Sequence, residues 1–243
     1  MSITEVDFLP KLVAYIVEAA RTNGDKAPSE RELAEHFAVS RGQVRESLAI
    51  LEAMRIIQRR AKSGIYLTLD EAGLDSMALL ARAGVQLDAA QIFQAVELRK
   101  IHEIKAAELA ANRATEANFE RLRDILDRSE SQIADGLGLQ ELDGELHLEI
   151  VRATQNDLFH KICASFYAAS FQRMPVYFGQ IERSIKSHAE HQQIFDALYR
   201  RDAILAQALM NTHLGRAMSY WTELLDSARE QAEKKPAAEP DHV

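Results

Sequence analysis

Asp143 and His147 lie four residues apart in the segment LDGELHLEI, and a helix would place both side chains on one side. His191 and His213 follow, 22 residues apart, on the last two predicted helices. If those helices are antiparallel neighbours, one carboxylate and three imidazoles can converge in the core of a helical bundle. A mixed oxygen and nitrogen site of this kind suits Zn, Ni, Mn or Fe, and it differs from the cysteine-rich sites of structural zinc.

Each of these histidines also has an ordinary interpretation. A single histidine is more often a surface residue or a hydrogen-bonded core residue than a ligand. His188, three residues before His191, is an alternative ligand, although it could equally orient a ligand or face solvent. A metal-dependent hydrolase or isomerase is the alternative function, but it would need a general base beside an activated water. Glu145 and Glu149 flank His147 and should point away from its face, so the sequence favours binding over catalysis.

A second set of residues could bind DNA. Ser29 and Glu32 have the spacing of a capping box, in which a serine hydroxyl and a glutamate carboxylate satisfy the first turn of a helix. Ser40 and the glutamine three residues later repeat that spacing after a short turn, so two capped helices should form a helix-turn-helix. The second helix would then present three side chains to the major groove, where an arginine can bind guanine through two hydrogen bonds. These side chains are Arg41, Gln43 and Arg45. The alternative is that the arginines are only the solvated face of a helical hairpin.

The remaining elements follow from apolar residues spaced three and four apart. Six helices are predicted in the second part of the chain, and they should pack as an antiparallel bundle. Their ranges are 91–113, 116–135, 140–154, 157–174, 183–200 and 202–228. The strand signal is confined to residues 57–69, where a Lys-Ser-Gly turn separates two short segments able to pair as a hairpin.

The fold class is therefore mainly α, with a small DNA-binding domain followed by an all-helical bundle. The stretch after the hairpin, residues 70–90, is rich in small and acidic residues and contains glycine, which suits a linker with one short helix. The end of the chain is charged and contains two prolines, which is typical of a disordered tail. The expected parts are a helix-turn-helix domain at 1–69, a linker at 70–90, a helical domain at 91–228 and a disordered tail at 229–243.

The amino-acid composition limits the classes of protein to which this chain can belong. With 47% hydrophobic and 27% charged residues, the chain is typical of a globular protein that can form two modest domains. The formal charge is −8, yet residues 1–67 hold 10 Lys and Arg against 9 Asp and Glu, so a basic face there is compatible with DNA binding. The one cysteine, Cys163, excludes an intramolecular disulfide framework. Because the sequence has no signal-peptide pattern and no apolar run long enough for a bilayer, we expect a cytoplasmic protein without a membrane partner.

The string PSERELAEHFAVSRGQVRESLAILEAMRIIQRRAKSGIYL resembles the winged helix-turn-helix of GntR-family bacterial transcription regulators. In the FadR-like branch of that family, the matching positions contact DNA. Here they are Arg31, Arg41, Arg45 and, at the tip of the wing, Gly64. The sequence also departs from the family pattern, because Ala27 stands where leucine is usual and Arg55 where glycine often sits. The connecting segment TNGDKAPSE is short, so the first strand of the wing sheet should be reduced or missing.

The region from about residue 91 to 225 resembles the all-helical FCD domain that follows the DNA-binding module in FadR-like regulators. The likeness lies in the segments ELRKIHEIKAAELAANRAT, LDGELHLEIVRATQN and EHQQIFDALYRRDAILAQALMNTH. In metal-binding members the matching positions hold a divalent ion, with zinc expected ahead of nickel, manganese or iron. The implied ligands are Asp143, His147, His191 and His213. Arg99 sits where family members often carry a basic residue facing the pocket, and it could bind an effector carboxylate or form a salt bridge with Glu103 or Glu97.

Together these residues indicate a ligand-responsive, DNA-binding transcription regulator, expected to be a repressor. The resemblance implies a small organic-acid effector that binds the helical domain and alters operator affinity. We expect a homodimer on an inverted-repeat operator. One short module gives little affinity for a half-site, whereas a two-fold pair binds two half-sites of double-stranded DNA together. No catalytic residue is assigned.

Overall fold

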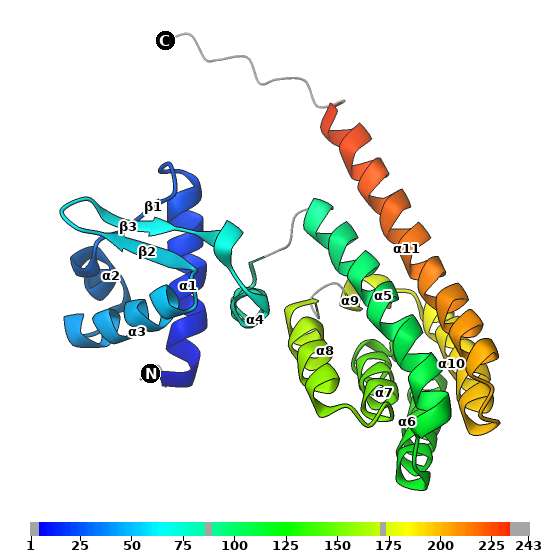
Figure 1. The fold of residues 1–243 in the computed structure, drawn as a ribbon. Coiled ribbons are helices and arrows are strands. Elements are labelled where there is room, and N and C mark those ends of the chain that lie inside the picture. The colour runs from blue at the N-terminus through cyan, green and yellow to red at the C-terminus, as the bar shows by residue number, and fades with distance from the viewer. Residues whose placement is uncertain (1–4, 86–88, 171–173, 234–243) are drawn as a thin grey trace. The chain divides into compact units, whose positions relative to one another are not determined.

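The protein forms two compact units in a computed structural model that describes residues 5–85, 89–170 and 174–233 (Figure 1). The first unit consists of Met1–Gln86 and Lys161–Arg173, and the second consists of Leu87–His160 and Met174–Val243. Helices dominate the described parts of both units, and a small sheet lies in the first. The mainly α class is therefore confirmed. Within the described ranges, no helix combines the length and the apolar character needed to span a bilayer.

The first unit is built from short helices and a three-stranded antiparallel sheet. Within residues 5–85 its elements are, in chain order, α1 (Glu5–Arg21), β1 (Lys26–Ala27), α2 (Glu30–Phe37), α3 (Arg41–Ala53), β2 (Ile57–Arg60), β3 (Gly64–Leu67), the 3₁₀ turn η1 (Leu69–Glu71) and α4 (Leu74–Arg82). The strand order is β1-β3-β2, and Tyr66 of β3 aligns with Lys26 on one side and Gln58 on the other. The predicted pair of helices and the predicted hairpin are confirmed, and α4 is the short helix expected in the linker.

Two serines define where α2 and α3 begin. The Ser29 hydroxyl accepts from the backbone N–H of Glu32, and the Glu32 carboxylate accepts from the backbone N–H of Ser29 at 2.8 Å. Ser40 accepts from the backbone N–H of Gln43 at 3.1 Å. Each cap satisfies a donor that the first helical turn leaves without an intrahelical partner. α2 ends at Phe37, and the left-handed backbone of the next residue, Ala38 (φ 53°), turns the chain toward α3.

A single apolar core holds α3 against the rest of the unit. Its buried members include Phe8, Leu12, Ile16, Leu33, Val44, Leu48, Leu51, Ile56 and Ile65. Val44, Leu48 and Leu51 of α3 are buried in this core, and Val39 packs partly buried against it. Burying a large aliphatic side chain stabilises a fold by about 1.5–3 kcal/mol. These contacts fix which side of α3 remains exposed.

Both departures from the family pattern near the wing have structural consequences. β1 is present but has only two residues, Lys26–Ala27, which confirms the expectation of a reduced first strand. Arg55 has a left-handed backbone (φ 56°), a conformation that glycine adopts without a steric cost. The hydroxyl of Thr68 donates to the carbonyl oxygen of Arg55 at 3.0 Å and helps to hold this turn.

Six of the remaining helices correspond to the six predicted from the sequence, although several of their ends differ from the predicted ranges. They are α5 (Ala89–Arg113), α6 (Glu116–Ala134), α7 (Gln140–Arg152), α8 (Asp157–Ser170), α9 (Met174–Tyr177), α10 (Ile181–Tyr199) and α11 (Ala203–Glu233). The short α9 lies where the sequence predicted only a break between helices. α11 continues to Glu233, past the predicted end of the helical domain at residue 228. The rest of that tail, residues 234–243, lies outside the described residues.

In the second unit, α5 packs against α7, α10 and α11, and α6 packs against α7 and α10. α5 and α11 lie side by side and run in opposite directions (Figure 1). The turn before α6 is fixed by a capping box between Thr115 and Asn118, whose side chains and backbone N–H groups bind each other. α7 thus packs against α5 and α6, and α5 also packs against α10 and α11, the helices that carry the remaining candidate ligands.

Candidate functional site

The start of α3 exposes the side chains predicted to contact DNA. Arg41 and Arg45 are exposed and Gln43 is half-buried. Arg31 on α2 and Gly64 at the beginning of β3 are exposed as well. The first unit therefore leaves these positions, on two helices and the hairpin turn, accessible to a ligand. Their contacts with DNA stay a prediction.

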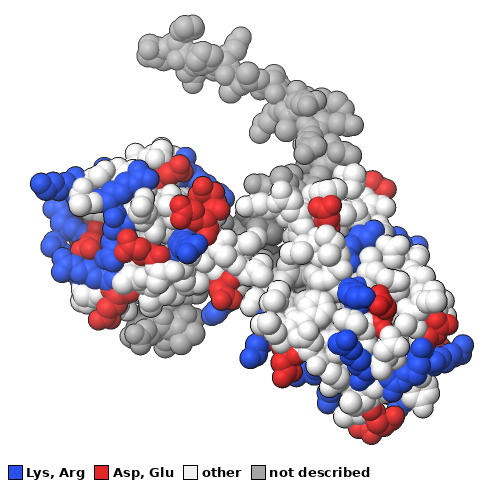
Figure 2. All heavy atoms as spheres, in the orientation of Figure 1, with Lys and Arg blue, Asp and Glu red and all other residues white. Residues whose placement is uncertain are grey.

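Further basic residues lie beside these positions. Arg59, Arg60 and Lys62 follow one another on β2 and in the turn to β3, and all three are exposed. Figure 2 shows Lys and Arg side chains gathered on the side of the first unit where Figure 1 places α2 and that turn. A locally basic face attracts phosphates even when the whole chain is acidic. The sequence-based assignment missed these three residues, although the run QRRAK was a visible signal.

Two local contacts restrict the shape of this surface. Oε2 of Glu30 lies 2.7 Å from Nε of Arg45, so α2 holds a side chain of α3. Gly64 has φ of 129°, a backbone that side-chain-bearing residues rarely adopt, and a Cβ there would lie 3.1 Å from Cε of Lys26. The hairpin turn thus needs glycine at this position.

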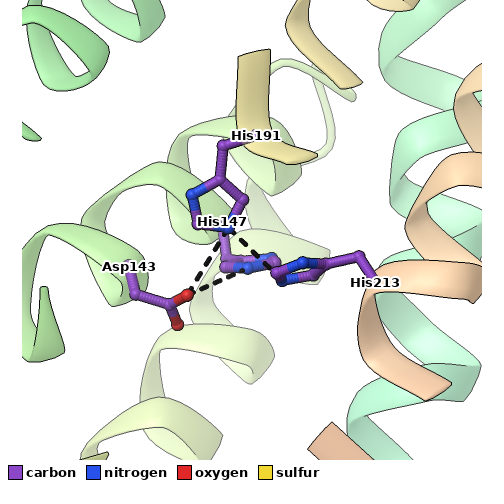
Figure 3. A group of neighbouring side chains, drawn as sticks. All are labelled: Asp143, His147, His191 and His213. Atoms are coloured by element: carbon purple, nitrogen blue, oxygen red, sulfur yellow. Dashed lines mark hydrogen bonds and ion pairs between the residues drawn. The ribbon is translucent and has the colours of Figure 1, made fainter. Parts of the chain in front are cut away.

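The four predicted metal ligands come together in the second unit (Figure 3). Asp143 and His147 come from successive turns of α7, His191 comes from α10 and His213 comes from α11. All four are buried, and one possible ligand atom from each lies within 4.8 Å of the others. Tertiary packing thus produces the convergence that spacing alone could not establish.

Within this cluster, the Nε2 atoms of the histidines face one another and the carboxylate (Figure 3). Oδ1 of Asp143 lies 3.6 Å from Nε2 of His147 and 3.5 Å from Nε2 of His191. Nε2 of His213 lies 3.3 Å from Nε2 of His191. Three imidazole nitrogens and a carboxylate oxygen in a buried space form a donor set that fits a divalent transition metal.

Burial and nearby charges keep three members of the cluster in the forms that bind a cation. Burial alone would raise the pKa of Asp143, but the charges of His147 and Arg99 outweigh it and hold that pKa well below its usual value. Burial, and then the charge of His147, lowers the pKa of His213 to about 3. Burial, and then the charge of His213, lowers the pKa of His191 well below its usual value. At neutral pH the carboxylate is therefore ionised and these two imidazoles are neutral.

Two glutamates that the sequence did not identify as part of the site lie behind the histidines. Oε2 of Glu103 on α5 lies 2.6 Å from Nδ1 of His147. Oε2 of Glu190 on α10 lies 2.8 Å from Nδ1 of His213. Burial would lower the pKa of His147, but the negative charges of Glu103 and Asp143 outweigh it, so the pKa is raised. These glutamates come from helices other than those of the histidines they face, so no local spacing in the sequence could reveal them.

Arg99 is buried beside the cluster, with 4% of its surface exposed. Its Nε donates to Glu103 at 2.8 Å, and its Nη2 donates to Oδ2 of Asp143 at 3.2 Å. The sequence left open a salt bridge to Glu103 or Glu97, and the structure places Glu103 in that role and leaves Glu97 exposed. A contact between Arg99 and an effector stays a prediction.

Three other residues near the ligands in the sequence lie outside the cluster. His188 is buried on α10 but is not among the converging four. Glu145 and Glu149 instead bind side chains of α6: Glu145 binds Arg128, and Glu149 binds Asn118 and Arg121. The prediction that these two glutamates point away from the ligands is confirmed.

Two family models match the chain, one to each part. Residues 10–67 match the bacterial regulatory proteins of the gntR family, and residues 94–216 match the FCD domain. The chain belongs to the GntR family. This regulator therefore joins a GntR DNA-binding domain to an FCD ligand-binding domain, in the arrangement of the FadR-like branch.

Named relatives of the regulator agree with this assignment. It is 32% identical to the HTH-type transcriptional regulator LutR of Bacillus subtilis over 196 residues, which cover 79% of this chain and 89% of LutR. It is 28% identical to the HTH-type transcriptional repressor NanR of Cronobacter sakazakii over 208 residues, or 83% of this chain and 78% of NanR. These relatives are transcription regulators and not enzymes, as predicted for this chain.

A solved structure also shares the fold. Lar, which controls the expression of the Listeria monocytogenes agr system, matches with a TM-score of 0.62 at 19% identity. The match covers 92% of this chain and 99% of that one. At this level of identity the likeness concerns the fold alone.

Proposed function

We propose that this regulator is a repressor whose affinity for an inverted-repeat operator changes when a small carboxylate effector binds a metal ion in the FCD domain. The observation that carries the proposal is the buried convergence of Asp143, His147, His191 and His213. Repression is favoured because the relative NanR is named as a repressor. A protein that binds operator DNA acts where the bacterial chromosome lies, so we assign it to the cytoplasm.

The four converging residues would hold the ion. One carboxylate and three imidazoles suit zinc well, and nickel, manganese and iron also accept this donor set. When bound, such an ion supplies a positive charge and open positions at which a carboxylate or α-hydroxy-carboxylate can bind. A hydroxy, keto, sugar or aromatic acid is therefore the expected class of effector.

Arg99 would hold Asp143 and Glu103 in place beside the ion. Its guanidinium already donates to Glu103 and Asp143, so part of its hydrogen-bonding capacity is used inside the cluster. We therefore assign the main carboxylate contact to the ion, and keep Arg99 as a secondary one.

The outer face of α5 supports the proposed homodimer. Leu98 and Ile101 on this face are 44% and 65% exposed, high values for large apolar side chains in the middle of a helix. Glu97 lies four residues before Ile101 and Lys105 four residues after it, and both are exposed. If two copies pair α5 antiparallel across a two-fold axis at Ile101, each Glu97 faces Lys105 of the second copy. The face is thus complementary to itself in both apolar character and charge.

Sedimentation of variants tests this dimer face. We expect Ile101→Asp to shift the protein toward monomer, because it would bury unpaired charge between two copies. Ile204→Asp is the matched control, since Ile204 is 83% exposed at the start of α11. Glu97→Lys should weaken the dimer and the double variant Glu97→Lys with Lys105→Glu should restore it. Lys105 also pairs with Glu108 of its own helix at 2.6 Å, but an exposed pair of this kind is worth only about 0–1 kcal/mol and can exchange. An unchanged dimer in Ile101→Asp would contradict the assignment.

Gel-shift experiments test the regulator itself. The probe is DNA from upstream of the protein's own gene, compared with unrelated DNA of equal length at the same salt concentration. Candidate hydroxy, keto, sugar and aromatic acids are added to the zinc-loaded protein. We expect sequence-specific binding that one class of acid changes. Specific binding that no acid changes would contradict the effector part of the proposal, and the absence of specific binding would contradict its operator part.

A further inference from the structure

His147 and His213 have the same arrangement of ring contacts. Each directs Nε2 into the cluster of candidate ligands, and each has a glutamate oxygen at Nδ1. The separations are 2.6 Å from Nδ1 of His147 to Glu103 and 2.8 Å from Nδ1 of His213 to Glu190. Two histidines on different helices therefore share one arrangement, in which Nε2 faces the cluster and Nδ1 faces a glutamate from another helix.

This arrangement matters because a neutral imidazole carries one ring hydrogen, and only the other nitrogen has a lone pair for a metal. A carboxylate is an acceptor only, so at Nδ1 it favours the form in which Nδ1 carries the hydrogen. Nε2 is then left as the ligand atom. Carboxylates in this position also fix the ring orientation and increase the basicity of the ligating nitrogen.

We propose that Glu103 and Glu190 are positioning residues that hold His147 and His213 with Nε2 directed at the metal. The inference rests on the proposed metal binding and adds which ring nitrogens bind the ion and which residues determine this. Arg99 has the corresponding role for Asp143, because it binds Oδ2 and leaves Oδ1 facing the histidines.

The two glutamates differ in how firmly they are held. The Glu103 side chain is 1% exposed and also accepts from Arg99 at 2.8 Å. The Glu190 side chain is 15% exposed and shares its charge with Arg216, which is itself 34% exposed. Water can therefore partly replace Glu190 as the acceptor for Nδ1 of His213. The loss of Glu103 should weaken zinc binding more than the loss of Glu190.

Zinc affinity measured by competition with a coloured chelator tests the proposal on the full chain. Glu103→Gln and Glu190→Gln keep the shape of the side chain and remove its charge. We expect each to weaken zinc binding by about 10- to 100-fold, the usual effect of losing a partner of this kind. Glu182→Gln is the matched control, because Glu182 is exposed on α10, the helix that carries Glu190, and this variant should bind zinc like the wild type.

Nitrogen NMR of the histidine rings in the zinc-bound protein shows which ring nitrogen carries the hydrogen. A glutamate that only stabilised the fold would not affect the Nδ1 signal of one particular histidine. In the wild type, His147 and His213 should each carry hydrogen at Nδ1. Glu103→Gln should shift the Nδ1 signal of His147 and leave that of His213 unchanged, and Glu190→Gln should do the reverse. If Glu103→Gln fails to fold, Glu190→Gln tests the same rule at a position that is partly exposed.

The results distinguish the positioning role of the two glutamates from the metal site on which it depends. If the wild type binds zinc and both glutamine variants bind it equally tightly, the positioning role is wrong and the metal site stands. Zinc bound through Nδ1 would overturn the inference in the same way. If the wild type takes up no zinc, the metal site itself is wrong and the positioning role falls with it.

Discussion

Oε2 of Glu30, in the first turn of α2, lies 2.7 Å from Nε of Arg45 on α3. The contact joins the two helices of the helix-turn-helix on their exposed side, opposite the shared apolar core. Because the Arg45 side chain is 63% exposed and the Glu30 side chain 31% exposed, the pair is worth only about 0–1 kcal/mol of stability. Its main effect is on the direction of an arginine that we expect to contact a base.

Removing a base-contacting arginine should weaken operator binding without unfolding the domain. We expect Arg41→Ala and Arg45→Ala each to reduce operator affinity by about 1–3 kcal/mol, the range for a lost bidentate contact to guanine. Fluorescence anisotropy with labelled operator at fixed salt measures this change. Arg200→Ala removes the same charge from an exposed position in the FCD domain and is the control. Unchanged affinity in both variants would contradict the assignment of α3 as the recognition helix.

Glu30→Gln should reduce the discrimination between operator and unrelated DNA. Binding to unrelated DNA should strengthen because a negative charge is removed near the phosphates. Binding to operator should gain less because Arg45 is no longer held in one direction. The ratio of the two affinities, measured in the same buffer, should fall by up to about fivefold, which corresponds to about 1 kcal/mol. Glu18→Gln on α1 is the control at another exposed position, and an unchanged ratio in Glu30→Gln would argue against a role for this pair.

The capping box of α2 should contribute measurably to stability. Ser29→Ala removes the acceptor for the backbone N–H of Glu32, so we expect a loss of about 1 kcal/mol in the free energy of unfolding. Denaturant titration followed by circular dichroism measures it. Ser131→Ala, an exposed site within α6, should change stability little or raise it slightly because alanine favours helices. Equal effects of the two substitutions would show that the cap is not significant.

Purified protein should carry close to one divalent ion per chain, removable by a chelator. We expect His147→Ala, His191→Ala and His213→Ala each to lower zinc occupancy and to abolish most of the rise in melting temperature that zinc causes, because an ion bound only by the folded state stabilises it. His188→Ala is the matched control, since His188 is buried on the same helix as His191 but lies outside the cluster. Elemental analysis and thermal unfolding measure both effects. Equal occupancy in all four variants would rule out this site.

Effector and operator should affect each other's binding to the same extent. Linkage is reciprocal, so an acid that changes operator affinity must bind free and operator-bound protein with affinities that differ by the same factor. The usual range of such coupling is about 1–3 kcal/mol, or roughly 5- to 150-fold. Isothermal titration of an acid found by thermal-shift screening, with and without operator, measures it. Identical affinities in both states would mean that the acid is not the regulatory ligand.

The sequence by itself determined the local structure of this protein. Ser29 and Ser40 set the starts of two helices because a cap acts within three residues of its own position. The hairpin at residues 57–69 and the six long helices followed from turn residues and apolar spacing, which are also short-range signals. The resemblance to GntR regulators rested on the same contiguous segments, so it too could be found before the fold was known.

Only the tertiary structure decided which side chains meet. Asp143 and His147 share a helix face by spacing, but their meeting with His191 and His213 depends on how α7, α10 and α11 are rotated about their axes. Successive residues on a helix point in directions about 100° apart, so a shift of one position would turn a ligand away from the cluster. The contacts of Glu103 and Glu190 with the histidines depend on the same packing between helices distant in sequence. The packing also decided the position of Arg99, which is buried and donates to both Glu103 and Asp143.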